Sequence, residues 1–300
     1  MMGSVITEKR ILFLTQTGVG ILGNLSLLCL YIFILITGHK LRPIDLIFNQ
    51  LLFANALVLF PKEIPLTLVS LGWKFVLDDT GCKLVFYFHG VGRGVSLSTT
   101  CLLSGLQAIK LCPTVSRWME LKVRSSKCIG FCCFLSWILN LYLNIIVYLS
   151  MTEQLNSKNL KKKDFGYCSA DMTDNHIGNL QAVMLLDVDV ICLGLMAWAS
   201  GSMVLVLHRH KHRVQHIHSN SLSPRPSRAT RTILVLVSMF VSFYSLSPIL
   251  TLCISLIVNP GQWLKDTSVL VASSFPAFSP FVLMISDARV SRFFAFCQGD

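Results

Sequence analysis

The sequence predicts an all-α protein in which seven helices cross a membrane as one bundle. The first observation behind this prediction is composition: the 300 residues are 53% hydrophobic and 14% charged, whereas soluble domains average about 25% charged residues. The second is a set of seven apolar runs, each long enough for the roughly 20 residues that a spanning helix needs. The third is the polar composition of the segments between these runs.

The seven runs account for the whole chain, residues 1–300, as a single membrane domain. We place the helices at 11–36, 44–71, 82–111, 128–149, 180–207, 232–258 and 267–285. They are too long and too continuous for the strands of a membrane barrel. The first run, of about 26 residues, is also too long for the apolar region of a cleavable signal peptide, so we expect it to remain as the first crossing.

The third run carries a polar stripe. Its members recur at helical steps of three or four residues and share one helix face: Phe86, His89, Arg93, Ser96, Thr100 and Ser104. Arg93 lies about 16 Å along the helix from Cys82, near mid-membrane. A charge at this depth is costly and should face a partner inside the bundle, for which the candidates are Asp187, Asp189 and Glu63.

Two interpretations of this stripe stay open. In the first, a ligand pocket in the outer half of the bundle is lined by Phe86, His89, Arg93, Asp187 and Asp189. In the second, Arg93 belongs to a structural ion pair that holds the bundle together.

The later runs differ from one another in polar content. The fourth contains no charged residue, and the fifth continues into a segment with five histidines between His208 and His218. No carboxylate or cysteine completes a metal site there, so we expect no metal ion and interpret the segment as a basic face for a cytosolic partner or anionic lipid headgroups. Pro248 in the sixth run, and Pro276 and Pro280 in the seventh, free backbone carbonyls and supply hinges.

The distribution of basic residues predicts an outside N-terminus. With this orientation, the cytoplasmic segments hold 15 of the 26 Lys and Arg residues, against nine in the outer segments. An excess of Lys and Arg marks the cytoplasmic side. The positive charge is clustered between apolar runs, so it indicates membrane topology and lipid contact and not nucleic-acid binding.

The positions of the 11 cysteines do not indicate a disulfide scaffold. Six of them fall inside apolar runs, where a thiol behaves as a small hydrophobe: Cys29, Cys101, Cys132, Cys133, Cys192 and Cys253. Cys82 and Cys168 both face the oxidising side under this topology, and we expect a disulfide between them.

The sequence contains no catalytic constellation and implies no cofactor. It has no Gly-rich phosphate loop with Lys-Ser/Thr, no His-Glu-x-x-His and no Gly-x-Ser-x-Gly. An enzyme is therefore not expected. A small-solute transporter or channel is the alternative from another class, but its charges should line several helices, whereas here they concentrate in the outer halves.

Several motifs resemble those of the vomeronasal type-1 receptor family. They cover nearly the whole chain: Gly23-Asn24, His89-Gly-Val-Gly-Arg-Gly-Val-Ser96, Thr99-Thr-Cys-Leu-Leu-Ser104, Gln107-Ala-Ile, Ser116-Arg-Trp118, Leu207-His-Arg-His-Lys, Arg228-Ala-Thr, Phe275-Pro and Ser279-Pro-Phe-Val-Leu283. Gln107-Ala-Ile-Lys110 stands where most rhodopsin-like receptors have Asp-Arg-Tyr, and Phe275-Pro-Ala-Phe-Ser-Pro280 stands where they have Asn-Pro-x-x-Tyr. The family shares both departures.

The resemblance implies a pheromone receptor of the plasma membrane. Such a receptor would bind a small chemosignal and activate an inhibitory-type heterotrimeric G protein. The alternative interpretation of the sequence is a bitter-taste receptor, which has a related fold and a different ligand. The expected basic G-protein contacts are Lys110, Arg117, Arg209, Arg213 and Arg231. Gly90 is smaller than the residue expected in many relatives, and we interpret it as enlarging the pocket beside His89.

Overall fold

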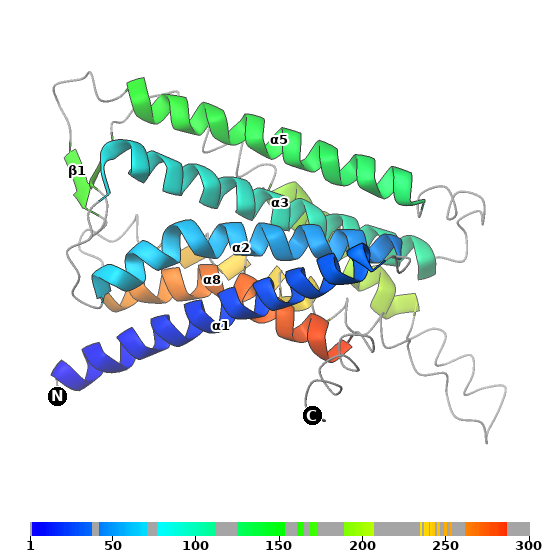
Figure 1. Cartoon of the computed structure of the whole chain (residues 1–300), viewed down its shortest axis with the longest axis horizontal. Helices are drawn as coiled ribbons and strands as arrows, with labels where there is room; N and C mark the ends of the chain where they lie inside the picture. Colours follow the sequence, from blue (N-terminus) through cyan, green and yellow to red (C-terminus); the bar gives the residue numbers. More distant parts are fainter. Residues whose placement is uncertain are drawn as a thin grey trace.

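The computed structural model is a bundle of long helices (Figure 1). The residues that it describes are 2–37, 42–70, 77–111, 125–153, 161–164, 169–172, 189–206, 262–286 and part of 235–253. The labelled helices are α1 (Met2–Ile36), α2 (Pro43–Ser70), α3 (Asp79–Leu111), α5 (Ser126–Glu153) and α8 (Gln262–Ser286). A further helix spans Asp189–Val206, and helical residues recur between 235 and 253.

The described helices overlap the predicted runs, of which the fifth and sixth are described only in part, and the all-α membrane fold is confirmed. Within the described part of the chain, five helices are long and apolar enough to cross a membrane. The helix α3 is not among the five because Arg93 and its Ser and Thr side chains lower its hydropathy. The helix α1 begins at Met2 and not at residue 11. A helix satisfies its own backbone hydrogen bonds and can continue beyond the apolar run.

A short hairpin adds strand structure that the sequence did not predict. Strand β1 (Lys161–Asp164) pairs antiparallel with β2 (Ser169–Met172), with Lys161 opposite Met172 and Asp164 opposite Ser169. Strand β2 contacts α3. Figure 1 places this hairpin at the same end of the bundle as the N-terminus of α1 and the start of α3. This is the arrangement expected if all three lie on the outer side.

Three helices begin at side-chain caps. The Asp78 carboxylate accepts from the Gly81 amide at 2.9 Å at the start of α3, and the Ser125 hydroxyl accepts from the Cys128 amide at 3.2 Å at the start of α5. In α2, which begins at Pro43, the Asp45 carboxylate accepts from the preceding Arg42 amide at 2.7 Å. Each contact satisfies an amide that has no partner inside the helix.

The helices α2 and α3 pack with their backbones close together. A Cβ atom added at Gly92 of α3 would lie 2.9 Å from the Ala54 carbonyl oxygen and 3.0 Å from the Val58 amide nitrogen of α2. Only glycine permits this approach, since the obstructing atoms are backbone. The helix α2 also contacts α1, α5 and α8, so it lies at the centre of the described bundle.

The helix α5 packs on a second set of α3 glycines. A Cβ atom at Gly90 or Gly94 would overlap the side-chain oxygens of Asn144 or Asn140, both of which are buried. These residues are four apart on each helix, so each glycine receives one asparagine. Gly90 therefore faces α5, and the interpretation that it enlarges a pocket beside His89 was wrong.

Proline explains how α1 attaches to α8. Pro280 has no amide hydrogen, so the carbonyl of Pro276, four residues earlier, lacks its usual helical donor. The Asn24 side-chain amide of α1 donates to this Pro276 oxygen at 2.7 Å. The Asn-Pro pairing thus satisfies a carbonyl that would otherwise be unpaired in lipid, where such a group is costly.

We predict that Gly92→Ala destabilises the protein while Gly105→Ala does not. The methyl group at residue 92 meets α2 backbone, and overpacking of this kind costs about 1–3 kcal/mol. At Gly105, on the same helix, nothing lies within 4 Å of an added Cβ, so alanine should add about 0.5–1 kcal/mol through its helix preference. Melting temperature in detergent and surface expression measure the difference. Equal behaviour of the two variants would contradict the proposed contact between α2 and α3.

Candidate functional site

The candidate site lies in the outer half of α3. Phe86, His89 and Arg93 follow one another at helical spacing there, and all three are partly exposed. The His89 ring nitrogen Nδ1 lies 3.2 Å from the Val58 carbonyl oxygen of α2. Because a carbonyl only accepts, Nδ1 carries the proton in this contact. The contact fixes the orientation of the imidazole against α2.

Arg93 forms an ion pair with Asp189, at the start of the Asp189–Val206 helix. The guanidinium donates a hydrogen bond from Nη2 to the Asp189 carboxylate. Asp189 was one of the three partners suggested by the sequence, and the side chains are 36% and 12% exposed. The pair joins α3 to the Asp189–Val206 helix while leaving part of the Arg93 side chain accessible. Ligand contact by these residues stays a prediction.

The inner half of the polar stripe is structural. The Ser96 hydroxyl donates to the Asn55 side-chain oxygen at 2.9 Å, and the Asn55 amide donates to the Ser279 hydroxyl at 2.8 Å. All three side chains are fully buried, so this chain of hydrogen bonds joins α3, α2 and α8. Thr100 and Ser104 instead donate to carbonyls of their own helix.

Sequence reasoning missed Asn55 and Ser279. Asn55 lies in the middle of an apolar run, and an asparagine at that depth needs a partner on another helix because lipid offers none. That signal was present in the sequence. Ser279 was quoted only as part of a motif, and nothing in its spacing pointed to Asn55.

The cysteines divide as predicted between apolar runs and the outer end of α3. Cys29, Cys101, Cys132, Cys133, Cys192 and Cys253 are free thiols. Cys82 is buried and disulfide-bonded. Cys168 lies outside the described residues, so its pairing with Cys82 stays a prediction, which the contact of α3 with the adjoining strand β2 favours.

Most of the expected cytoplasmic contacts cannot be placed. Lys110 is the penultimate residue of α3, which ends at Leu111. Asp187 and four of the basic residues lie outside the described part of the chain: Arg117, Arg209, Arg213 and Arg231. The histidines between His208 and His218 are also outside it. Among the residues that are described, no three His, Cys, Asp or Glu side chains are grouped as a metal site would require.

Comparison with known proteins gives matches along nearly the whole chain. Residues 7–296 match the model of the vomeronasal organ pheromone receptor family. The chain is 56% identical over 295 residues to vomeronasal type-1 receptor 1 of Homo sapiens, and the match covers 97% of this chain and 83% of that relative. It is 47% identical over 286 residues to vomeronasal type-1 receptor 4 of Homo sapiens, with 94% and 95% covered.

We predict that Arg93→Ala lowers melting temperature and surface expression. The substitution leaves the Asp189 carboxylate without this partner, and since Arg93 is partly exposed the cost should be about 1–3 kcal/mol, between the values for exposed and buried pairs. The double variant Arg93→Ala/Asp189→Ala should lose less than Arg93→Ala, because the uncompensated charge is removed. Normal stability and expression with a lost ligand response would instead make Arg93 a ligand contact alone.

We also predict that Cys82→Ser, Cys168→Ser and the double variant are equally destabilised. A disulfide closing so long a loop contributes about 4–5 kcal/mol in the chain-entropy model, and removing either partner removes all of it. Non-reducing peptide mapping and melting temperature test the pairing. Additive losses in the double variant would show that the two cysteines are not bonded to each other.

Proposed function

The chain belongs to the vomeronasal type-1 receptor family, and from this we propose that it is a chemosignal receptor that crosses the plasma membrane seven times. Members of this family are described as pheromone receptors of the vomeronasal organ. Together with the apolar helices, membership identifies the chain as a signalling membrane protein. We further propose that the chain lies in the plasma membrane. We also propose a position for its ligand and the type of G protein that it activates.

The ligand binds in the outer half of the bundle, beneath the β1–β2 hairpin. It contacts Phe86, His89 and Arg93 of α3, together with Asp187 and Asp189. The observation that carries this assignment is the Arg93–Asp189 ion pair, with 36% of the Arg93 side chain exposed. The guanidinium and carboxylate largely cancel in charge, so an uncharged, mainly apolar ligand with a hydrogen-bonding group suits the site better than a strongly charged one.

The conformational effect of ligand binding is transmitted to the cytoplasmic side through the same ion pair. A ligand that accepts a hydrogen bond from Arg93 competes with Asp189 and changes how firmly α3 is held to the Asp189–Val206 helix. Such a ligand shifts the population between two helix arrangements in proportion to its preference for one of them. The arrangement it favours exposes the G-protein contacts at Lys110, Arg117, Arg209, Arg213 and Arg231.

Nucleotide exchange on an inhibitory-type G protein tests this function. The receptor is purified, reconstituted in vesicles with the G protein and exposed to a panel of uncharged volatile and steroid-like compounds. We expect at least one compound to accelerate exchange, with no effect in vesicles that lack the receptor. Transport of a radiolabelled solute without any exchange would identify a transporter instead.

We predict that replacing the five basic cytoplasmic residues by glutamine weakens G-protein activation without weakening ligand binding. Long-range electrostatic attraction mainly sets the rate at which the receptor and the G protein associate. The nucleotide exchange rate should therefore fall by about tenfold at low salt and by less at high salt. The matched control replaces the outer residues Lys161, Lys162 and Lys163 by glutamine and should leave exchange unchanged. An equal loss in both variants would argue against a cytoplasmic basic contact.

A further inference from the structure

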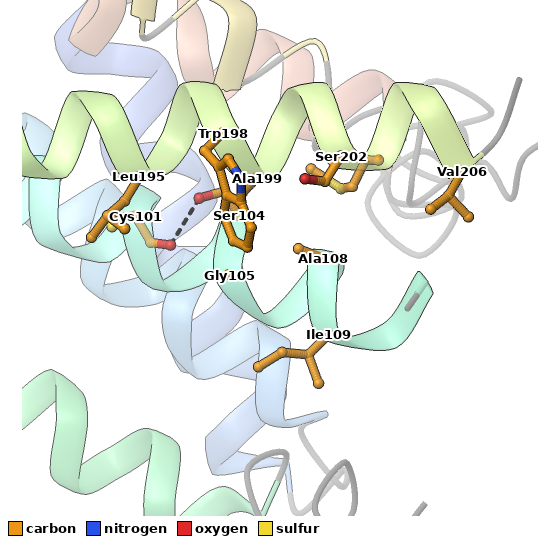
Figure 2. Close-up of a pocket in the computed structure, with 11 residues that line it drawn as sticks. Cys101, Ser104, Gly105, Ala108, Ile109, Leu195, Trp198, Ala199, Ser202 and Val206 are labelled. Atoms are coloured by element: carbon orange, nitrogen blue, oxygen red, sulfur yellow. Dashed lines mark hydrogen bonds between the residues drawn. The ribbon is translucent and has the colours of Figure 1, made fainter. Parts of the chain in front are cut away.

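A cavity of about 410 Å³ lies between the inner half of α3 and the Asp189–Val206 helix (Figure 2). This volume is in the range of about 300–1,000 Å³ that is usual for small-molecule sites. The walls come from residues between Cys101 and Ile109 on α3 and between Leu195 and Val206 on the facing helix. Figure 2 shows side chains of both helices reaching into the space between them.

This cavity is separate from the candidate site around Arg93. Cys101, its outermost α3 residue, is eight residues beyond Arg93, or about 12 Å along the helix axis. Its innermost α3 residue, Ile109, is two residues from the end of the helix at Leu111. At the outer end, the thiols of Cys101 and Cys192 lie close together, so the two helices are in contact there before the cavity begins.

Among the residues that the structure describes, none of those lining the cavity is charged. Small residues leave the space open: nothing lies within 4 Å of a Cβ atom added at Gly105. Two hydroxyl groups are present, from Ser104 and Ser202. Ser104 already donates to the Cys101 carbonyl at 2.8 Å (Figure 2). Among the described residues, the structure gives the Ser202 hydroxyl no hydrogen-bond partner, so Ser202 can donate to a ligand.

The cavity is reached from the bilayer. Leu195 and Trp198 line it and are 52% and 71% exposed, and both belong to a helix apolar enough to cross a membrane. Side chains exposed on such a helix meet lipid and not water. A molecule dissolved in the inner leaflet can therefore enter laterally, whereas a charged molecule would lose its hydration and find no opposite charge inside.

We propose that this cavity binds a small, uncharged, mainly hydrocarbon molecule carrying one acceptor oxygen, such as a ketone or ether. The apolar walls take its hydrocarbon part, and Ser202 donates to its oxygen. The acyl chain of a phospholipid fits less well, because its hydrocarbon has no acceptor for Ser202 at this depth. The site would exist whether or not the chain activates a G protein.

Benzophenone tests the site directly, because it is an uncharged aromatic ketone that crosslinks to nearby C–H bonds when irradiated. Full-length receptor in phosphatidylcholine vesicles is irradiated with tritiated benzophenone, and labelled peptides are mapped by mass spectrometry. We expect saturable labelling of 101–109 and 195–206. Labelling confined to other segments, or labelling that does not saturate, would overturn the proposal.

The variant Gly105→Leu should fill the cavity and reduce this labelling by about tenfold. Gly201→Leu is the matched control, since Gly201 is exposed on the facing helix, does not line the cavity and also has nothing within 4 Å of an added Cβ. It should label as the parent protein does. Equal labelling of both variants would place the probe outside the cavity.

Ser202→Ala tests the hydrogen bond without a change in bulk. It should weaken benzophenone binding roughly fivefold and leave competition by diphenylmethane, which lacks the carbonyl, unchanged. Unchanged benzophenone binding would refute the role of Ser202. A phosphatidylcholine with a photoreactive acyl chain provides the last comparison: if it labels the same residues and benzophenone does not displace it, the cavity holds a lipid chain and the proposal is wrong.

Discussion

Lipid tails are as apolar as leucine, so the helices of this protein gain little from burying apolar side chains against one another. Their association must come from close packing and from polar groups that find partners on neighbouring helices. The packing of α2 against α3 meets this requirement most fully. Gly92 lets the two backbones approach, and the Asn55 side chain accepts from Ser96 across the same contact. The other described helices attach to this pair.

Each attachment uses a polar group placed within an apolar run. Asn55 continues through Ser279 to α8, and Asn24 connects α1 to a carbonyl that Pro280 leaves without a donor. In α5, the Trp137 indole donates to Gln50 of α2 at 2.7 Å, while Asn140 and Asn144 fill the spaces above Gly94 and Gly90. A polar side chain in a spanning helix therefore does not by itself indicate a ligand site.

The Asp189–Val206 helix is held to α3 by side-chain contacts of a different kind. Near its outer end the contact is the Arg93–Asp189 ion pair, followed by the neighbouring thiols of Cys101 and Cys192. Beyond these thiols the inner cavity lies between the two helices. An ion pair that is partly exposed can exchange partners, whereas the buried amides and hydroxyls of the α2 contacts cannot do so without leaving polar groups unpaired. For this reason we assign the ligand-dependent change of the proposed mechanism to the Asp189–Val206 helix.

The order of residues alone specified which segments are helices, because the length and continuity of an apolar run are local properties that lipid converts directly into helical structure. It also placed Arg93 inside the bundle and included Asp189 among its partners, since a charge at that depth needs an opposite charge. Packing in three dimensions brought Asp189 against Arg93, turned Gly90 toward Asn144, and joined Ser96 to Ser279 through Asn55. These outcomes depend on how each helix is rotated about its axis and which neighbours it meets. Helical periodicity defines the faces of a helix but does not specify what lies opposite each one.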